Sequence, residues 1–251
     1  MDSALNDRVV LVTGGTRGIG AAVAEAFAAE GARVALTYRN DEEAAERAAA
    51  GLGSERAMAV RYALDEPDSA RAALDEVRQR WGGVDVLVAN AYHRTGRRPA
   101  GQSFEQVAAA EWQATITDNL IATMALTQAV LPDMRGRRWG RVVYLSSHIV
   151  GHGRRGQETY AAVKSGLHGF ARSLAWEAGK EGVLVNVVAP GLTRTEGVRQ
   201  QLPAALREGE RARTATGRLS EPGDVAAAVL FLGSGANGNI SGQVLEVSGG
   251  R

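Results

Sequence analysis

The chain has 251 residues, of which 45% are hydrophobic, and its 29 basic and 28 acidic side chains leave a formal net charge of +1. This balance argues against a surface built for polyanions, so we expect no nucleic-acid partner. The absence of cysteine excludes disulfide bonds and thiolate chemistry.

Length and hydropathy bound the architecture and the location. A chain of this size is commonly one α/β domain, which we expect to span residues 1–251. The first strand-like run begins close to Met1, which leaves no room for a signal peptide. No apolar run approaches the length of a membrane span, so we expect no membrane partner and a cytoplasmic location.

Strand-like runs alternate with helical stretches along the whole chain. The runs are short and rich in β-branched residues, and their alternation with helices predicts a doubly wound, Rossmann-type α/β fold. We expect a seven-stranded parallel sheet with helices on both faces, its strands at residues 8–13, 33–38, 57–63, 84–89, 141–146, 183–188 and 243–247.

The first predicted strand leads into a glycine-rich turn and then into an alanine-rich helix that extends to about Glu30. Strand, glycine turn and helix in this order are the context of a dinucleotide-binding fingerprint. Gly14 permits a tight turn, Gly18 lets backbone amides approach a pyrophosphate, and Gly20 lets the helix pack closely on the strand. The predicted cofactor loop comprises Gly14, Thr16, Arg17, Gly18, Ile19 and Gly20.

The end of the second predicted strand indicates which dinucleotide binds. NAD-binding folds commonly place an acidic residue there to accept hydrogen bonds from the ribose, and this chain has Tyr38 instead. Arg39 follows directly, and Arg17 lies inside the glycine loop. Two guanidinium groups can hold a 2′-phosphate by charge-assisted hydrogen bonds, so we predict NADP(H) as the cofactor. The alternative is that either arginine is merely solvated.

Tyr160 and Lys164 lie four residues apart on a predicted helix and therefore share a face. An isolated tyrosine has a pKa of roughly 10, and a neighbouring cation lowers that pKa toward the range in which acid–base catalysis works. Ser147 follows the strand at 141–146, at the carboxyl end where parallel sheets bind ligands. These three side chains are candidate catalytic residues, although a Y-x-x-x-K pair alone is common on amphipathic helices.

The glycine spacing G-x-x-x-G-x-G, together with the Ser/Tyr/Lys set, resembles the short-chain dehydrogenase/reductase family from about Arg8 to Gly250. Further matching motifs follow in the family's order. They are Asn90 of an N-A-G motif, Asn119 of a catalytic tetrad, Pro190 and Gly191 followed by Thr195 beside the nicotinamide, and an I-S-G-Q segment at 240–243. The resemblance implies that residues 1–90 mainly bind the cofactor and that 91–251 carry the catalytic residues, a substrate loop and a lid.

The resemblance also implies a role for each member of the tetrad. Tyr160 would donate a proton to the substrate oxygen, and Ser147 would hydrogen-bond the same oxygen. Lys164 would hold the nicotinamide ribose and depress the tyrosine pKa, and Asn119 would anchor a water of a proton relay. Implied cofactor contacts are Asn90, Tyr160, Lys164, Pro190, Gly191 and Thr195, with Leu64 at the adenine end, because the family's adenine-contacting Asp falls on Ala63.

Within the family, Trp112, the segment 138–141 and the overall length look most like 3-oxoacyl-carrier-protein reductases and polyketide ketoreductases. That likeness implies reduction of a ketone in a small-molecule substrate, which a carrier protein or coenzyme A could carry. Such reductases are thought to dock acidic carriers through a basic pair. Arg138 matches one member of the pair, but Glu181 stands in place of the other, so carrier docking is in question.

The loop after the fourth predicted strand departs from the family pattern. Tyr92 replaces the glycine of N-A-G, and residues 93–99 make the loop longer than usual. Because the loop follows the carboxyl end of a strand, Tyr92 and His93 are candidates to shape a pocket for a bulky or aromatic substrate. An ordinary surface loop is the alternative.

Three further features lie near the predicted site. His148 and His152 could contact substrate or a proton path, but without a third ligand at metal spacing they predict no metal site. The arginine-rich stretch 193–218, where relatives carry a lid, is interpreted as an exposed helical face. Trp176 is predicted to lie at a subunit contact, because relatives commonly form homotetramers through its helix and the helix that contains Asn119.

Other functions remain open at this stage. A dehydrogenase that oxidises a sugar, a steroid or another secondary alcohol would use the same residues. A non-catalytic nucleotide sensor usually lacks part of the tetrad, which is complete here. An enoyl reductase normally spaces its tyrosine and lysine more widely than Tyr160 and Lys164.

Overall fold

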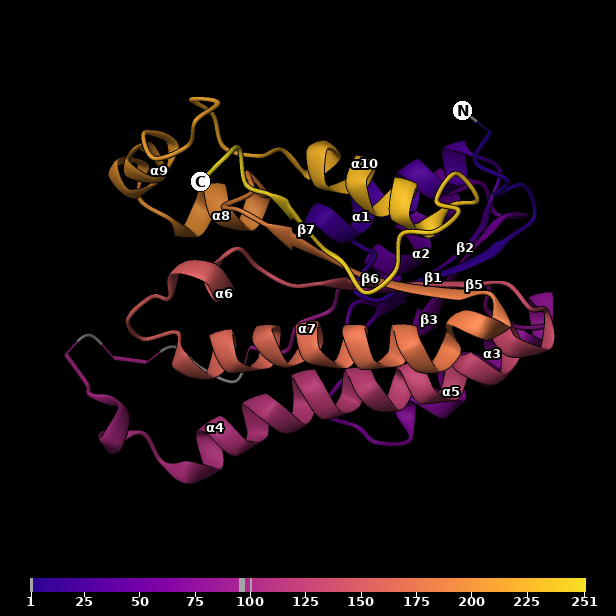
Figure 1. Cartoon of the computed structure of the whole chain (residues 1–251), viewed down its shortest axis with the longest axis horizontal. Coiled ribbons are helices and arrows are strands. Elements are labelled where there is room, and N and C mark those ends of the chain that lie inside the picture. The colour runs from indigo at the N-terminus through magenta and orange to yellow at the C-terminus, as the bar shows by residue number, and fades with distance from the viewer. Residues whose placement is uncertain (1, 95–97, 100) are drawn as a thin grey trace.

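The computed structural model describes residues 2–94, 98–99 and 101–251, and the strands form one parallel sheet (Figure 1). The predicted seven-stranded parallel sheet is confirmed, and no strand boundary differs from its predicted position by more than two residues. The strands are β1 (Val9–Val12), β2 (Arg33–Tyr38), β3 (Ala57–Arg61), β4 (Val86–Ala89), β5 (Gly140–Leu145), β6 (Val183–Pro190) and β7 (Val244–Val247).

The strand order β3-β2-β1-β4-β5-β6-β7 places β1 in the interior of the sheet, between β2 and β4. Leu11 of β1 pairs with Ala35 of β2 on one side and with Leu87 of β4 on the other. The chain builds outward from β1 first in one direction and then in the other. A crevice therefore opens at the carboxyl ends of β1 and β4, where doubly wound sheets bind ligands.

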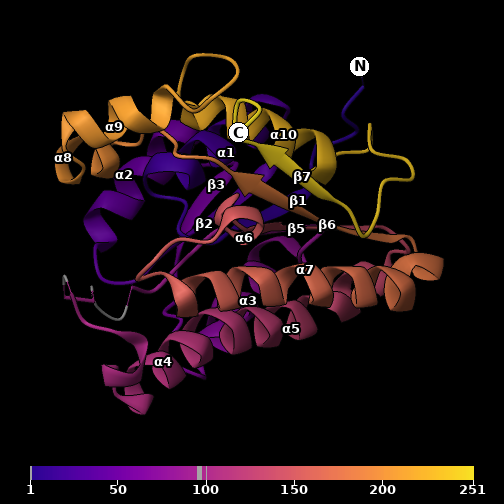
Figure 2. The ribbon, with the colours of Figure 1, turned by 60° about the vertical axis from the view of Figure 1, so that its left-hand side comes forward.

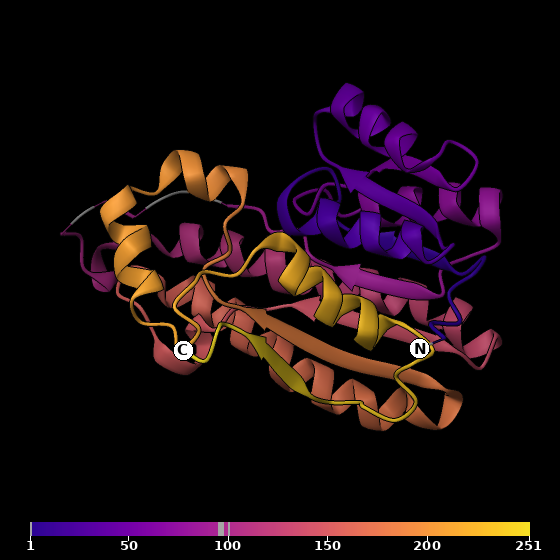
Figure 3. The same ribbon diagram turned by 90° about the horizontal axis from the view of Figure 1, so that it is seen from above.

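Helices cover both faces of the sheet (Figures 1 and 3). One face carries α1, α2 and α10, and the other carries α3, α5 and α7. The helices are α1 (Gly18–Ala29), α2 (Glu42–Leu52), α3 (Ser69–Trp81), α4 (Ala109–Ile116), α5 (Ala122–Gly136), α6 (Ile149–His152), α7 (Glu158–Ala178), α8 (Glu196–Gln201), α9 (Ala204–Arg211) and α10 (Pro222–Gly233).

The alternation of side chains along each strand divides the hydrophobic core between the two faces. Val10 and Val12 of β1 pack with Phe27 of α1 on one face, whereas Leu11 packs in the cluster on the other face. Fully burying a side chain of this kind stabilises the fold by about 1.5–3 kcal/mol. Strands buried on both faces explain why the predicted runs are almost continuously apolar.

Short elements gather beyond the carboxyl ends of the strands. Helix α6 follows β5, and the lid helices α8 and α9 follow β6; Figures 1 and 2 both place the three at the same end of the sheet. A π-helical turn, Thr117–Ile121, separates α4 from α5. Among the described helices, none is both long enough and apolar enough to cross a bilayer.

Candidate active site

The turn after β1 needs glycine at three positions. Gly14 and Gly18 have φ angles of 64° and 59°, in the left-handed region that side chains disfavour. A Cβ on Gly20 would lie 2.1 Å from the carbonyl oxygen of Gly14 and 2.7 Å from Nδ2 of Asn90. Gly20 is therefore required because the start of α1 approaches the chain just beyond β1 and β4 closely. The exposed backbone that results can accept a pyrophosphate at the start of α1.

Neighbouring strands hold this glycine loop in place. The Asn90 amide donates from Nδ2 to the carbonyl oxygens of Thr13 (2.9 Å) and Gly14 (3.2 Å), and its backbone N–H donates to Thr13 Oγ1 (2.9 Å). The Gly14 N–H donates to Thr37 Oγ1 at 3.0 Å. Asn90 thus braces the loop through its side chain. Sequence analysis missed Thr13 and Thr37, and the only sign of them was a polar residue at the end of a buried apolar strand.

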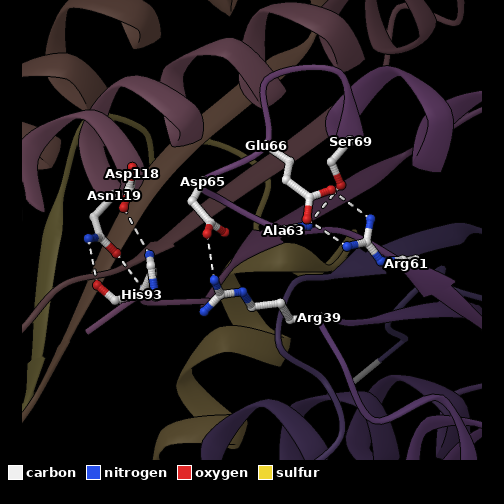
Figure 4. A network of polar contacts seen from close by, with 9 residues as sticks. All are labelled: Arg39, Arg61, Ala63, Asp65, Glu66, Ser69, His93, Asp118 and Asn119. Atoms are coloured by element: carbon white, nitrogen blue, oxygen red, sulfur yellow. Dashed lines mark hydrogen bonds and ion pairs between the residues drawn. The ribbon is translucent and has the colours of Figure 1, made fainter. Parts of the chain in front are cut away.

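At the adenosine end, Arg39, which is predicted to hold the 2′-phosphate, is already paired with a carboxylate. Its Nη2 donates to Asp65 Oδ2 at 2.5 Å, and the two side chains are 44% and 29% exposed (Figure 4). The neighbouring Arg61 forms a two-point ion pair with Glu66 at 2.7 and 2.6 Å. Arg17 is exposed in the glycine loop, and its side chain has no partner in the described part of the chain. A 2′-phosphate at Arg39 would therefore compete with Asp65.

The residues at the predicted adenine contact lie against the core. Leu64 is half-buried and packs on the cluster between the sheet and α3. The backbone N–H of Ala63 donates to Ser69 Oγ at 2.8 Å, which fixes the turn between β3 and α3 (Figure 4).

The ends of β5 and α7 bring Ser147, Tyr160 and Lys164 together. Burial raises the pKa of the Tyr160 phenol above its usual value, while a hydrogen bond with Ser147 and the charge of Arg94 act in the opposite direction. Burial alone lowers the pKa of Lys164 to about 8. Lys164 is not among the groups that act on the Tyr160 pKa here, so its predicted depression of that pKa stays a prediction. The Nζ of Lys164 donates to the carbonyl oxygen of Leu145 at 2.7 Å and lies 5.8 Å from the Tyr160 ring centroid.

Tyr92 lies against the two residues of α7. Its ring meets the ring of Tyr160 edge to face, with centroids 5.0 Å apart and planes at 76°. The Nζ of Lys164 lies 5.2 Å from the Tyr92 ring centroid, within the range of a cation–π contact. Burial raises the pKa of Tyr92 to about 12, so its phenol stays protonated at neutral pH. The structure therefore places the glycine replacement in contact with the predicted proton donor.

The long loop after β4 is tied down at both ends. Residues 95–97 and 100 lie outside the described part, so that portion of the predicted substrate loop is not placed. Beyond the gap, Arg98 Nη1 donates to Glu158 at the start of α7 at 2.6 Å, and its Nε and Nη2 donate to the carbonyl oxygen of Gln102. Arg98 thus links the loop to the helix that carries Tyr160.

Two hydrogen bonds join His93 and Asn119, and His93 also contacts Asp118 (Figure 4). Asn119 Oδ1 accepts from the His93 N–H at 2.7 Å, and its Nδ2 donates to the carbonyl oxygens of His93 and Thr115, both at 2.9 Å. His93 Nδ1 lies 2.9 Å from Asp118 Oδ2, a carboxylate that sequence analysis missed. The Asn119 amide is therefore committed to positioning the loop after β4. Its backbone carbonyl accepts from Thr123 Oγ1 at 2.7 Å and keeps a second lone pair, and the predicted water relay stays a prediction.

Comparisons with known proteins agree with this geometry. A family model described as enoyl-(acyl carrier protein) reductase matches residues 14–251. The chain is 37% identical to the 3-oxoacyl-(acyl-carrier-protein) reductase FabG of Vibrio cholerae over 98% of both chains. It is 36% identical to an acetoacetyl-CoA reductase of Shinella zoogloeoides over 97% of this chain and 98% of that one.

A solved short-chain dehydrogenase of Burkholderia cenocepacia in complex with NADP matches with a TM-score of 0.84 and 33% identity, over 98% of each chain. The chain belongs to the short-chain dehydrogenase/reductase family. It is therefore an oxidoreductase with a nicotinamide cofactor. In this short-chain dehydrogenase/reductase two residues that are not among the expected family residues contact expected ones: Tyr92 contacts Tyr160, and Asp65 pairs with Arg39.

Two histidines of the short-chain dehydrogenase/reductase, His148 and His152, follow Ser147 at the start and the end of α6. The His148 N–H donates to the carbonyl oxygen of Pro190 at 3.0 Å, and its ring centroid lies 5.5 Å from that of His152. Burial and the nearby Arg251 lower the pKa of His148 to about 4, so its ring is neutral at pH 7. Within residues 2–94, 98–99 and 101–251, no group of three potential metal ligands comes together.

The start of the predicted lid in this short-chain dehydrogenase/reductase lies against the glycine loop. A Cβ on Gly18 would lie 3.3 Å from Thr195 Cγ2, so the predicted cofactor residue Thr195 is directly above the loop. A Cβ on Gly191 would lie 2.9 Å from the Cα of Ser248, which explains the glycine after Pro190. The arginines of the predicted lid are exposed, as expected, with Arg207 partly buried among them, and five of them line one cavity.

Proposed function

We propose that this protein uses NADPH to reduce the ketone of a β-ketoacyl thioester to a secondary alcohol. The observation that carries the proposal is the convergence of Ser147, Tyr160 and Lys164 at the carboxyl end of β5, beside the braced glycine loop. The relatives that reduce 3-oxoacyl-(acyl-carrier-protein) and acetoacetyl-CoA support the substrate class. The NADP complex of the Burkholderia dehydrogenase supports the cofactor.

The nicotinamide, when bound, supplies a hydride to the carbonyl carbon. Tyr160 then donates its phenolic proton to the oxygen on which negative charge develops, and Ser147 stabilises the same oxygen by a hydrogen bond. Lys164 has one donated hydrogen bond to Leu145, so two of its three N–H donors remain for ribose hydroxyls. The raised pKa of Tyr160 keeps the phenol protonated before the reaction, which suits a proton donor in the reductive direction.

The spacing of Tyr160 and Lys164 favours ketone reduction over enoyl reduction. The two residues lie one helical turn apart on α7, whereas enoyl reductases of the family normally space this pair more widely. The description of the matching family model names an enoyl reductase, but the 3-oxoacyl and acetoacetyl-CoA reductases that the chain resembles act on ketones. Turnover of a ketone and not of an enoyl thioester is therefore expected.

The preference for NADPH is expected to depend on the Arg39–Asp65 pair. Asp65→Asn should remove the competing carboxylate and tighten NADPH binding by about threefold, with no change for NADH, because an exposed ion pair is worth about 0.2–1 kcal/mol. Glu66→Gln is the matched control, since Glu66 pairs with Arg61 in the same turn. An equal gain in both variants would place phosphate recognition elsewhere.

We also propose that the protein assembles as a homotetramer through α5 and α7. Large apolar side chains are exposed on these helices and on the π-helical turn before α5, with Trp176 89% exposed, Ile121 53% and Met124 38%. Exposed apolar residues gathered on adjacent elements mark interaction sites. Sedimentation velocity on the wild-type protein and on Trp176→Glu would test this assembly, and a wild-type monomer would refute it.

The function is tested by following NADPH consumption with β-ketoacyl thioesters, enoyl thioesters and polycyclic aromatic ketones, and NADP⁺ reduction with secondary alcohols. Turnover should be fastest with the β-ketoacyl thioesters. Tyr160→Phe should lower kcat by at least about a hundredfold, the usual contribution of a positioned proton donor, and should leave NADPH binding intact. Preferred oxidation of a sugar or steroid alcohol would replace the proposal with the dehydrogenase alternative.

A further inference from the structure

The predicted lid contains a cavity of about 490 Å³ that is open to solvent and lies between α8, α9 and the segment that precedes α10. Its volume lies within the range of roughly 300–1,000 Å³ that small-molecule sites usually have. Five arginines from four stretches of chain converge on it, with one acidic residue, Glu208, among the described lining residues. The arginines are Arg194, Arg199, Arg207, Arg211 and Arg218.

Three of the five guanidinium groups have carboxylate partners. Arg211 makes two hydrogen bonds to Glu208, at 2.8 and 2.5 Å. Arg218 makes two to Asp224, at 2.5 and 2.9 Å. The third is a single contact at 3.0 Å. The pairs are Arg211–Glu208, Arg218–Asp224 and Arg194–Glu221. These contacts fix the walls of the cavity and neutralise the charges that build it.

The remaining two guanidinium groups have no carboxylate partner within the described residues. Arg207 donates from Nη1 to the backbone carbonyl oxygen of Arg199 at 2.6 Å, which leaves its charge unbalanced. The Arg199 side chain is exposed and has no hydrogen-bond or ion-pair partner in the part of the chain that the structure describes. The cavity thus carries two uncompensated positive charges in close proximity.

The chemistry of these charges selects the ligand. A guanidinium group donates two parallel N–H hydrogen bonds to two oxygens of one carboxylate or phosphate group. A phosphate monoester carries a charge of about −1.5 to −2 at neutral pH, which matches two unpaired arginines. A carboxylate or a phosphodiester carries one negative charge and would leave one arginine uncompensated.

The cavity adjoins the cofactor crevice. Arg194 precedes Thr195, whose Cγ2 lies above Gly18, and the Arg194 N–H donates to the Ser220 carbonyl oxygen at 2.8 Å. A β-bridge between Thr193 and Ser220 joins the two chain segments that form this wall. A ligand in the cavity therefore contacts the same chain segment that lies against the glycine loop.

We propose that the arginine-lined cavity binds the phosphorylated end of a coenzyme A thioester while its ketone lies at Tyr160. The inference rests on the proposed function, because it assigns the distal part of the same substrate. Coenzyme A ends in a 3′-phosphate monoester and a pyrophosphate, whereas the arm of an acyl carrier protein contains only a phosphodiester. The charge of the cavity therefore favours a coenzyme A thioester.

A second surface points to the same substrate. Near Arg138, where a carrier-binding pair would lie, Arg135 contacts both Glu177 and Glu181, with 2.7 Å between Arg135 Nε and Glu181 Oε2. The two carboxylates neutralise Arg135, so Arg138 and Lys180 remain as the basic groups of this surface. The expected carrier-docking pair is incomplete in the structure.

Direct binding tests the cavity without any turnover. Wild-type protein saturated with NADP⁺ should bind 3′-phosphoadenosine 5′-diphosphate in a calorimetric titration, and inorganic phosphate at least about tenfold more weakly. Arg207→Glu should weaken binding of the nucleotide by about tenfold or more. Arg80→Glu on α3 is the matched control, because Arg80 also donates to one backbone carbonyl, that of Ser54 at 2.8 Å, and the variant makes the same change in charge.

Kinetics then test the link to the substrate. The ratio of kcat/KM for acetoacetyl-CoA to kcat/KM for the N-acetylcysteamine thioester, which lacks phosphate, should fall by about tenfold in Arg207→Glu and stay constant in Arg80→Glu. Equal binding of nucleotide and inorganic phosphate, or a ratio that Arg207→Glu leaves unchanged, would overturn the proposal. If the wild type reduced neither thioester, the proposed function would fail, and the calorimetric titration would still decide whether the cavity is a phosphate site.

Discussion

Arg141 and Lys164 are both buried cations, each 5% exposed, and they attach to opposite ends of β5. Arg141 lies at the start of the strand, and Lys164 donates to Leu145 at its end. Burial lowers the pKa of Arg141 to about 10 and that of Lys164 to about 8. Desolvation thus lowers the pKa of a cation at both ends of one strand, and the two cations differ in how many hydrogen bonds they donate.

At the amino end, every nitrogen of the Arg141 guanidinium donates a hydrogen bond. Its nitrogens donate to the carbonyl oxygens of Ser234 (3.1 Å), Asn237 (3.0 Å) and Gly140 (2.8 Å). Its Cζ lies 4.5 Å from the centroid of the Trp139 ring, which adds a cation–π contact. At the carboxyl end, Lys164 has a single hydrogen bond. A buried cation with most of its donors to spare is suited to a ligand, and one with most of its donors bonded is suited to holding the fold.

The largest expected effect is loss of catalysis at the carboxyl end. Lys164→Met should lower kcat by about a thousandfold, because ribose binding and the charge near Tyr160 are both lost. The free energy of unfolding should not fall, since a desolvated ammonium is replaced by an apolar chain of similar length. Steady-state kinetics and urea unfolding check the two halves. A marked loss of stability with intact turnover would reverse the assignment of the two cations.

Arg141→Met should show the opposite pattern. It leaves several buried carbonyl groups without donors, so the free energy of unfolding should fall by about 4 kcal/mol. Turnover per folded molecule should stay within about twofold of the wild type, because the substitution lies at the amino end of the strands, away from the crevice. Chemical denaturation and active-site titration separate these quantities, and a loss confined to kcat would contradict the interpretation.

The pH dependence of stability sharpens the comparison further. The folded pKa of Lys164, about 8, lies below the value of about 10.4 for an unfolded lysine, so the unfolded chain binds more protons between these values. Stability should therefore rise with pH in this window. Relative to Lys164→Met, the wild type should gain about 3 kcal/mol between pH 7 and pH 10.5, as measured by urea unfolding at a series of pH values. A constant difference would show that Lys164 is not desolvated.

Tyr92 is expected to have the smallest effect. Tyr92→Leu removes the ring that contacts Tyr160 and Lys164, and it should change kcat/KM by about fivefold, in line with about 1 kcal/mol for an aromatic or cation–π contact. Tyr92→Phe keeps the ring and should behave like the wild type. A large effect of the Phe variant would instead implicate the Tyr92 hydroxyl.

The fold and the catalytic group follow from local patterns in the sequence. β-branched runs between helical stretches identified the strands, and the i, i+4 spacing placed Tyr160 and Lys164 on one helix face. The side-chain contacts of the site residues could not be predicted from such local patterns. Arg39 meets Asp65, and Asn119 meets His93, across 26 residues in each case, and no periodicity encodes such a contact. The lid arginines were visible as a charged stretch, but the cavity depends on how α8, α9 and the start of α10 fold around one another.

The bracing of the glycine loop has a kinetic consequence. Because Asn90 and Thr37 hold the loop in its binding shape through hydrogen bonds within the protein, no backbone ordering, worth about 1–2 kcal/mol for each residue, accompanies dinucleotide association there. The loop should meet the dinucleotide at a rate set by diffusion. A slow phase in stopped-flow fluorescence would then report movement of α8 and α9, and the order of binding and lid closure could be read from its concentration dependence.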